Sequence, residues 1–367
     1  MNYTDALNLI CDKKRLVIKT GLSRIESLLD KMGNPQDKIK VVHIAGTNGK
    51  GTVSNIIADA LMKCGYKVGL FTSPWITDYR EQIQINGNFI PEKTFADYVT
   101  EYQNEDATEF EFLTAVMYKY FADEKVDFAV VECGMGGKGD STNVVKNPEL
   151  CVITSVSMDH TDFLGSTLDE IASEKAGIIK ENSMVVLYPN GACESVFETK
   201  CKETGSRLVK VHNMGDFKSN NLETAKQALA CLGVRSQPVY PSLAARQEYI
   251  GNNMMIDGTH NKDGALALRD FLPNKKITAV IGMMRDKDID SYLKILAPRF
   301  EKIITVTVDN PRSISASDLA EIAKKYSDNV EICGNPNTAV SLAKQGNNFV
   351  LVCGSFYLAR QIRKYLI

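Results

Sequence analysis

Short apolar runs alternate with longer amphipathic stretches along most of the chain. The runs are hydrophobic on both faces, as is typical of parallel strands covered by helices. The pattern predicts strands at residues 41–45, 68–72, 128–132, 151–155, 184–187, 254–257, 278–282, 302–306 and 349–353. It predicts helices at 52–64, 168–179, 222–232, 264–271, 317–326 and 356–365. This repetition of strand and helix indicates a doubly wound α/β architecture.

The alternation weakens between residues 189 and 253, where Pro238 and Pro241 lie among many polar residues. A chain of 367 residues is also too long for one ordinary domain. We therefore expect two α/β domains, 1–243 and 244–367, with a hinge near residues 243–247.

Charge and cysteine content narrow the function classes. Lys and Arg (43) nearly balance Asp and Glu (45), which leaves no electrostatic footprint for nucleic acid or an acidic membrane. The nine cysteines form no C-x-x-C pair, which argues for a reducing compartment and against a zinc ribbon. No apolar stretch is long enough to span a bilayer. We expect a cytoplasmic monomer that acts on small molecules, without nucleic-acid or membrane partners.

The clearest chemical signal is the glycine-rich loop between the predicted strand 41–45 and the helix 52–64. It reads Gly46-Thr47-Asn48-Gly49-Lys50-Gly51-Thr52. Such a loop wraps backbone N–H groups around phosphate oxygens, and the helix N-terminus adds its positive dipole. Lys50 would reach the terminal phosphates and the Thr52 hydroxyl would bind Mg²⁺. The alternative is a glycine-rich turn that binds no ligand, but the flanking strand and helix favour a loop that binds phosphate.

With its shortened glycine spacing, this loop is similar to the ATP loop of the Mur ligase superfamily. Within that superfamily the sequence resembles the folylpolyglutamate synthase / dihydrofolate synthase branch over nearly its whole length. The motifs that carry the resemblance, in chain order, are GLSRI at 21–25, FTSP at 71–74, ECGMGG at 132–137 with DSTN at 140–143, DHTDFLG at 159–165, EKAGI at 174–178, DGTHN at 257–261, GMMRDKD at 282–288 and CGSF at 353–356.

The resemblance implies a P-loop, Mur-ligase-type ATPase domain with a parallel sheet, followed by a smaller Rossmann-like α/β domain. It also implies ATP-driven amide formation. A folate carboxylate would take the γ-phosphoryl group and become an acyl phosphate, and the amine of L-glutamate would then attack it. The enzyme would mainly position reactants and neutralise charge.

Two Mg²⁺ ions are part of this implied chemistry. One would bind the phosphates with Thr52 and Glu132, and the second would be held by Ser73, Glu132 and His160. Lys175 would carry a carbamate that supports the second ion. Without the motifs around them, each of these residues has an alternative interpretation. Glu132 and His160 could be structural or solvated residues, and Lys175 could be a solvent-facing or acid-paired lysine.

The family pattern also assigns substrate contacts. The implied catalytic residues are Lys50, Glu132, His160, Lys175 and His260. The implied ATP contacts are Asn48, Gly49, Lys50, Gly51, Thr52, Asn221, Arg246 and Asp257. The implied acceptor residues are Thr108, Glu109, Phe110, Glu111, Gly139, Asp140 and Ser141, with His260 and Ser355 beside the incoming amino acid. Phe110 would pack on a pterin ring or simply in the core, and Asp140 would pair with pterin N–H donors.

Several positions depart from the family pattern. Gln82 replaces an arginine near the pterin, Ala244-Ala245-Arg246 stands for Pro-Gly-Arg, Lys262 replaces a proline, and the segment 205–221 is short. The acceptor, reduced folate or dihydropteroate, therefore stays open. A ligase for a non-folate carboxylate is one alternative, and a non-catalytic nucleotide-binding protein is another. The retained Lys50, Glu132 and His160 argue against the second alternative.

Overall fold

The computed structural model describes residues 1–13 and 21–366. The chain forms two units. The first comprises Met1–Pro74, Arg80–Ser157 and Thr161–Pro241, and the second comprises Trp75–Tyr79, Met158–His160 and the chain from Ser242 on. The exact division at residue 243 stays a prediction. The sequence did not indicate that two short segments, 75–79 and 158–160, would belong with the second unit.

The first unit is built on an eight-stranded sheet with the order β4-β3-β2-β5-β1-β6-β7-β8. Its strands are β1 (Val41–Ala45), β2 (Val68–Phe71), β3 (Ile83–Ile85), β4 (Asn88–Phe89), β5 (Phe128–Glu132), β6 (Leu150–Ile153), β7 (Met184–Leu187) and β8 (Arg207–Lys210). The six strands from β2 to β8 in this order are parallel, which confirms the predicted α/β class.

Strand β1 is central, between β5 and β6. Ile44 is in register with Glu132, and Ala45 with Ile153, so the carboxyl ends of the three strands meet at one edge of the sheet. Ligands of open parallel sheets bind at such an edge.

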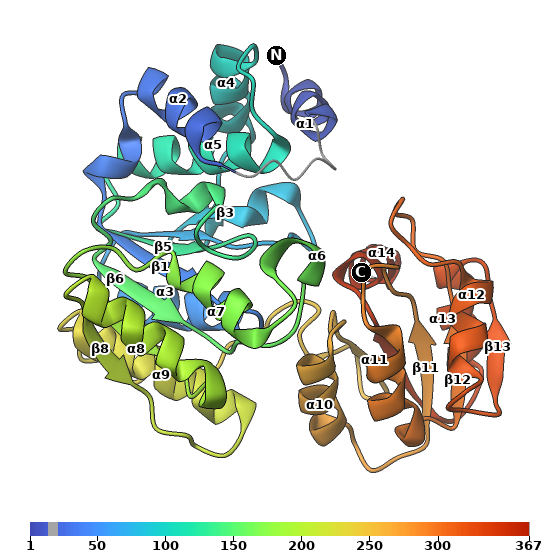
Figure 1. Cartoon of the computed structure of the whole chain (residues 1–367). Coiled ribbons are helices and arrows are strands. Elements are labelled where there is room, and N and C mark those ends of the chain that lie inside the picture. The colour runs from blue at the N-terminus through green and yellow to red at the C-terminus, as the bar shows by residue number, and fades with distance from the viewer. Residues whose placement is uncertain (14–20, 367) are drawn as a thin grey trace. The chain divides into compact units, whose positions relative to one another are not determined.

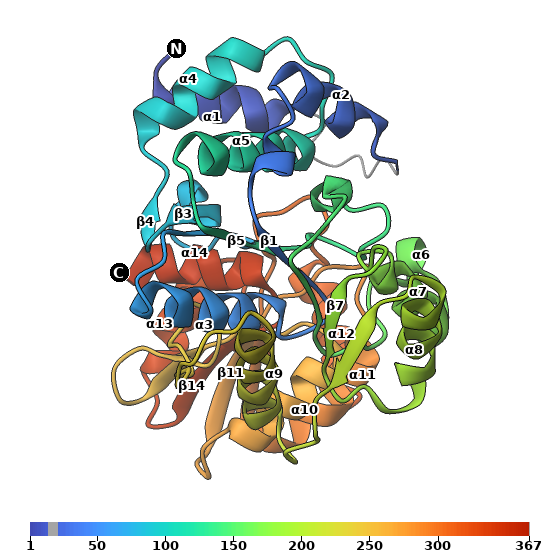
Figure 2. The same ribbon diagram turned by 90° about the vertical axis from the view of Figure 1, so that its left-hand side faces the viewer.

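Helices cover both faces of this sheet (Figure 1). The helices of this unit are α1 (Tyr3–Asp12), α2 (Ser23–Lys31), α3 (Lys50–Lys63), α4 (Glu92–Tyr102), α5 (Glu109–Asp123), α6 (Thr161–Leu164), α7 (Leu168–Ala176), α8 (Glu194–Glu203) and α9 (Phe217–Cys231), of which α1, α2 and α4 pack on α5. Alternate strand residues explain the two faces: Val42 and Ile44 pack with α3 and α9, whereas Ala45 packs with α7 and α8. Figure 2 shows α3 and α9 side by side.

Two antiparallel strands at one edge depart from the expected parallel sheet. β3 and β4 pair as a hairpin, and β3 also runs antiparallel to β2. The hairpin turns at Asn86 and Gly87, which have φ angles of 48° and 76°. Positive φ at both central residues is the requirement of the tight hairpin turn that Asn-Gly favours.

The second unit is a smaller doubly wound sheet with the order β13-β12-β11-β14-β10-β9, in which only β9 is antiparallel to its neighbour. Its strands are β9 (Glu248–Tyr249), β10 (Met254–Ile256), β11 (Ile277–Ile281), β12 (Lys302–Thr305), β13 (Val330–Ile332) and β14 (Phe349–Cys353). Its helices are α10 (Lys262–Phe271), α11 (Ile289–Leu296), α12 (Ala316–Ala323), α13 (Pro336–Lys344) and α14 (Phe356–Leu366). Helices α10, α11 and α12 contribute to one core cluster, and α13 and α14 to another.

The alternation of strands and helices continues through much of the segment where it weakens in the sequence. Between residues 189 and 241 the chain forms α8, β8 and α9, which complete the first unit. Within the described ranges, no helix combines the length and the apolar character that a bilayer crossing demands.

Candidate active site

The phosphate loop leaves β1 at Ala45 and enters α3 at Lys50. The segment after β6 braces it: the Thr47 N–H donates to the Ser155 carbonyl at 2.6 Å, and the Asn48 side chain donates to the Ser157 hydroxyl at 3.3 Å. The Lys50 ammonium folds back onto the loop, donating to the carbonyls of Gly46 (3.2 Å) and Thr47 (3.3 Å). The loop is thus held in shape by the fold.

A buried asparagine faces this loop from α9. Gly49 has a φ of 85°, and a Cβ atom there would meet the Asn221 side-chain oxygen at 2.6 Å. The Asn221 side chain is fully buried, and neither its Oδ1 nor its Nδ2 has a hydrogen-bond partner among the residues that the structure describes. An unpaired buried amide is costly. Its position against the phosphate loop makes it a candidate for contact with a ligand.

The predicted metal ligands Ser73 and Glu132 meet at the ends of β2 and β5. The Glu132 carboxylate is buried at the end of β5. Its Oε2 accepts the Ser73 N–H at 3.2 Å, and its Oε1 lies 4.0 Å from the Lys50 ammonium. Thr52 is buried in the first turn of α3. Carboxylate and hydroxyl oxygens, the types that these residues offer, are ligands that Mg²⁺ prefers.

Lys175 lies beneath the phosphate loop. It is in the last turn of α7, only 2% exposed, and its ammonium donates to the Gly46 carbonyl at 2.9 Å. The solvent-facing alternative is therefore wrong. Among the described residues, no group of three or more His, Cys, Asp and Glu side chains is arranged to hold a metal. The predicted sets draw only Glu132 and His160 from these four residue types.

The Asp140 carboxylate orders the loop that follows β5. Its Oδ2 accepts the Met135 N–H at 2.8 Å, and its Oδ1 accepts the N–H and hydroxyl of Thr142 at 3.0 and 2.5 Å. Burial raises its pKa, and these hydrogen bonds oppose that rise. Both oxygens are thus already engaged within the loop, next to the predicted acceptor residues Gly139 and Ser141.

The other predicted acceptor residues surround the start of α5. Thr108 and Glu111 form a capping box, and Glu111 also pairs with Arg24 of α2 at 2.8 Å. Phe110 is half-buried, with its ring 5.9 Å from that of Phe71 and close to Gly134. Glu111 therefore joins two helices.

A buried polar cluster around His43, next to the loop that follows β5, was not predicted. His43, in the middle of β1, is fully buried, and its Nε2 lies 2.8 Å from the Thr142 hydroxyl and 3.2 Å from the Cys133 sulfur. Because the Thr142 hydroxyl gives its proton to Asp140, His43 Nε2 carries the donor hydrogen. Burial and the charge of Lys180 lower the pKa of His43 to about 3, so the imidazole is neutral.

In the second unit, the predicted residues follow the carboxyl ends of β10 and β14. The Asp257 carboxylate accepts the N–H groups of Gln247 and Thr259, both at 2.8 Å, and burial raises its pKa despite these bonds. The Arg246 guanidinium lies over the Phe356 ring at 4.8 Å. Ser355 caps α14 by accepting the Leu358 N–H at 3.1 Å.

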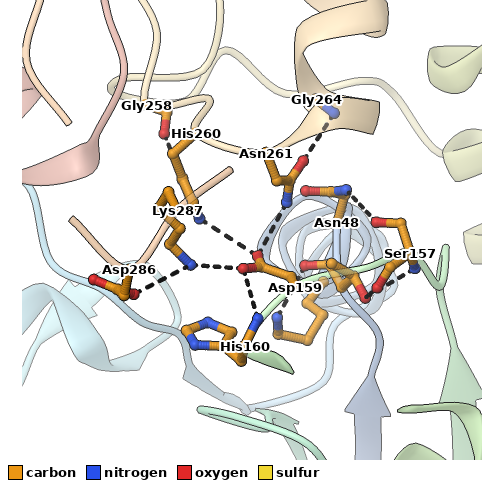
Figure 3. A network of polar contacts seen from close by, with 12 residues as sticks. Asn48, Ser157, Asp159, His160, Gly258, His260, Asn261, Gly264, Asp286 and Lys287 are labelled. Carbon is orange, nitrogen blue, oxygen red and sulfur yellow. Dashed lines mark hydrogen bonds and ion pairs between the residues drawn. The ribbon is translucent and has the colours of Figure 1, made fainter. Parts of the chain in front are cut away.

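Figure 3 shows a second polar network of this unit, centred on Asp159. Its Oδ1 pairs with the Lys287 ammonium at 2.6 Å, and its Oδ2 accepts from the Asn261 amide at 3.1 Å and lies 3.6 Å from His260 Nε2. Burial alone would raise the pKa of Asp159, but the neighbouring His260 imidazole and the charge of Lys287 hold that pKa well below its ordinary value. His260 Nδ1 lies 2.9 Å from the Gly258 carbonyl.

The structure thus groups the predicted residues into two sets. The loop residues 48–52, Ser73, Glu132, Lys175 and Asn221 gather in the first unit. Arg246, Asp257, His260 and Ser355 gather in the second, to which His160 also belongs. Sequence reasoning missed Asp159, Asn261 and Lys287 as contact residues, although all three lie inside the quoted motifs.

Comparisons with known proteins match this arrangement. The family model described as Mur ligase middle domain matches residues 44–234, and that described as Mur ligase, glutamate ligase domain, matches 245–356. The chain is 32% identical to the dihydrofolate synthase/folylpolyglutamate synthase of Bacillus subtilis, over 99% of each chain. E. coli FolC in complex with DHPP and ADP is similar in structure, with a TM-score of 0.91, 26% identity and coverage of 100% of this chain and 98% of that one.

A third similar protein is the bifunctional folylpolyglutamate synthase/dihydrofolate synthase of Yersinia pestis, solved with AMPPNP and a Mn ion. Its TM-score is 0.88 at 25% identity, and the match covers 100% of this chain and 98% of that one. Two of the solved relatives therefore hold a nucleotide, and one of these also holds a divalent metal.

Proposed function

Because the chain belongs to the Mur ligase family and, within it, to the folylpolyglutamate synthase and dihydrofolate synthase branch, we propose that it is an ATP-dependent ligase that adds L-glutamate to a folate carboxylate. Reduced folate is the first candidate acceptor, and dihydropteroate is the second. A monomer that works in the cytoplasm stays a prediction.

The buried Asn221 amide carries this proposal. It lies against Gly49 and has no hydrogen-bond partner within the described part of the chain, although both its oxygen and its nitrogen are buried. A nucleotide bound on the phosphate loop would give it a polar partner and remove the cost of burying it unpaired. If the phosphate loop bound no ligand, the free-energy cost of burying this unpaired amide would not be offset.

The loop residues would hold the ATP phosphates. Lys50 is 4.0 Å from Glu132 and bonded only weakly to its own loop carbonyls, so its ammonium can turn to the terminal phosphates. Mg²⁺ would be held by Thr52 and Glu132 at one site and by Ser73, Glu132 and His160 at another. Bound there, it would neutralise the charge that develops during phosphoryl transfer.

The proposal includes a carbamate on Lys175, formed with CO₂. The support is its place in the fold: a lysine that is 2% exposed and 2.9 Å from the Gly46 carbonyl lies close enough to act on the loop. Carbamylation would replace a cation with an anion. That change would favour a second divalent ion near Glu132 and Ser73.

The remaining residues would position the other reactants. Arg246 and Asp257 would contact the nucleotide, and His260 and Ser355 would contact the glutamate. The acceptor would lie against Thr108, Glu109, Phe110 and Glu111 and the loop Gly139-Asp140-Ser141. Because Asp140 already orders its own loop, its main contribution would be to hold that loop in shape around the acceptor.

Phosphate release tests the proposal. Protein, ATP, Mg²⁺ and L-glutamate are incubated with tetrahydrofolate, with dihydropteroate or without an acceptor, and Lys50→Ala serves as the inactive control. We expect release that needs both glutamate and one of the acceptors, and which acceptor works identifies the substrate. Nucleotide binding without acceptor-dependent release would overturn the folate assignment. It would leave a ligase for another carboxylate or a non-catalytic nucleotide-binding protein.

A further inference from the structure

A buried ion pair in the second unit has no role in the reaction proposed above. The Lys287 ammonium and Asp159 Oδ1 are 2.6 Å apart, and each side chain is only 8% exposed. Lysine is rarely buried to this degree unless its charge is paired. The pair joins the loop that follows β11 to the short segment Met158–His160.

Through Asp159 the pair acts on His160. The same Oδ1 atom that meets Lys287 also accepts the His160 N–H at 2.9 Å. His160 has a φ of 51°, a left-handed backbone conformation that costs energy for a non-glycine residue. Such a conformation persists only where its surroundings hold it, and the Asp159 carboxylate is the hydrogen-bonded group next to it.

The other carboxylate oxygen supports the turn after β10. Asp159 Oδ2 accepts from the Asn261 amide at 3.1 Å, and Asn261 in turn caps α10 by accepting the Gly264 N–H at 2.9 Å. One carboxylate therefore connects two proposed functional histidines, His160 and His260 (Figure 3).

Lys287 lies in the short loop between β11 and α11, where backbone hydrogen bonds hold it. Its N–H donates to the Met284 carbonyl at 3.3 Å, and the next residue, Asp288, caps α11 by accepting the Ser291 N–H at 3.1 Å. The ammonium is thus carried between the end of β11 and the start of α11.

We infer that Lys287 is a positioning residue of the ligase: its ammonium holds the Asp159 carboxylate, and through that carboxylate it fixes the turn that presents the His160 imidazole. The inference rests on the proposed role of His160 in holding the second Mg²⁺. Removing the ammonium would leave Asp159 buried without its cation and free the His160 turn to relax.

Metal binding tests this directly. Mn²⁺ replaces Mg²⁺, and its binding is followed by electron paramagnetic resonance in the presence of AMPPNP, so that no turnover is needed. Loss of an outer-shell partner typically weakens metal binding 10–100-fold. We expect Lys287→Met to weaken one of two Mn²⁺ sites by about 10–100-fold and to leave the other within about threefold. Lys276→Met, which removes an exposed pair with Glu301 in the same unit, is the matched control and should bind like the parent.

Two further variants separate positioning from general damage to the fold. Asp159→Asn keeps an acceptor for the His160 N–H but loses the charge pair, so it should weaken the same Mn²⁺ site. The double variant should be no weaker than the worse single one, because both changes break one contact. With four histidines in the chain, the His160 imidazole can also be followed by NMR, and its resonances should shift in Lys287→Met. If Lys287→Met does not fold, Asp159→Asn carries the test.

The outcome for His160→Ala tells the two proposals apart. If His160→Ala loses the second Mn²⁺ site and the folded Lys287→Met variant keeps it with unshifted His160 resonances, the positioning role is wrong and the metal role stands. If His160→Ala binds two Mn²⁺ ions as the parent does, or the parent binds only one, the metal role of His160 fails and the inference fails with it.

Discussion

Two neighbouring asparagines of α9, Asn220 and Asn221, differ in whether the fold satisfies their hydrogen bonds. The Asn220 side chain is satisfied: it accepts from the Met214 N–H at 2.7 Å and donates to Asn213 at 3.2 Å. Asn221 is buried and unsatisfied at both polar atoms. Since the fold gains nothing from an unpaired amide, the proposed nucleotide would give Asn221 the partner that the fold does not.

Replacing these two asparagines should therefore have opposite effects. Asn221→Ala should weaken ADP binding about tenfold, the equivalent of roughly one hydrogen bond to a buried group, and should not lower the melting temperature of the ligand-free protein. Asn220→Ala should lower that temperature and keep ADP affinity. Calorimetric titration and thermal unfolding measure both. Equal ADP affinity for parent and Asn221→Ala would contradict the assigned role.

His43 makes stability depend on pH. Its pKa is about 3 in the fold and about 6.5 when unfolded. As the pH falls below about 6.5, the unfolded chain gains a proton that the folded chain does not, so stability falls down to about pH 3. Between pH 7 and pH 5 the loss due to His43 is about 2 kcal/mol. His43→Gln should show a flatter decline in urea unfolding, and an unchanged slope would show that His43 is not buried neutral.

At the scale of elements, helix α5 is tied to α2 by Glu111. One carboxylate closes the capping box with Thr108 and pairs with Arg24, whose side chain is 21% exposed. Glu111→Gln removes the charge and should lower the free energy of unfolding by about 1–3 kcal/mol. The matched control is Lys31→Ala, which breaks the exposed pair with Glu105 and should cost less than about 1 kcal/mol. Similar losses in both variants would contradict a structural role for Glu111.

The same scale shows what the sequence can predict. The nine predicted strands and the helices α3 and α14 lie within one or two residues of their predicted bounds, because apolar runs and amphipathic stretches differ clearly there. Helix α5 was missed because it is buried on most of its surface, which removes the polar face that marks an amphipathic helix. Edge strands β8 and β13 were missed because their residues are half-buried or exposed.

Some residues of the candidate site could be identified from the sequence and others could not. Motif residues such as Lys50 and Glu132 could be identified because loop chemistry is local in sequence. The contacts of Lys287 and His43 could not, since their partners Asp159 and Thr142 lie far away in the chain. Asn86-Gly87 is a hairpin signal, and the structure has its turn there.

At the scale of the whole molecule, nucleotide binding should stabilise the fold. ADP with Mg²⁺ at a hundred times its dissociation constant contributes about 2.7 kcal/mol, which corresponds to a rise of roughly 5–10 °C in melting temperature for a unit of this size. EDTA should remove much of that rise because Thr52 and Glu132 would lose the metal between them and the phosphates. A rise that EDTA leaves intact would contradict metal-assisted binding.

The central claim is the joining of glutamate to a folate. The most direct measurement is the mass of the acceptor after incubation with ATP, Mg²⁺ and L-glutamate, with tetrahydrofolate and dihydropteroate in parallel and Lys50→Ala as control. We expect at least one acceptor to give a product that is heavier than the acceptor by one glutamyl residue. This product should form only with ATP and should be absent with Lys50→Ala. Both acceptors recovered unchanged, from protein that binds ADP, would contradict it.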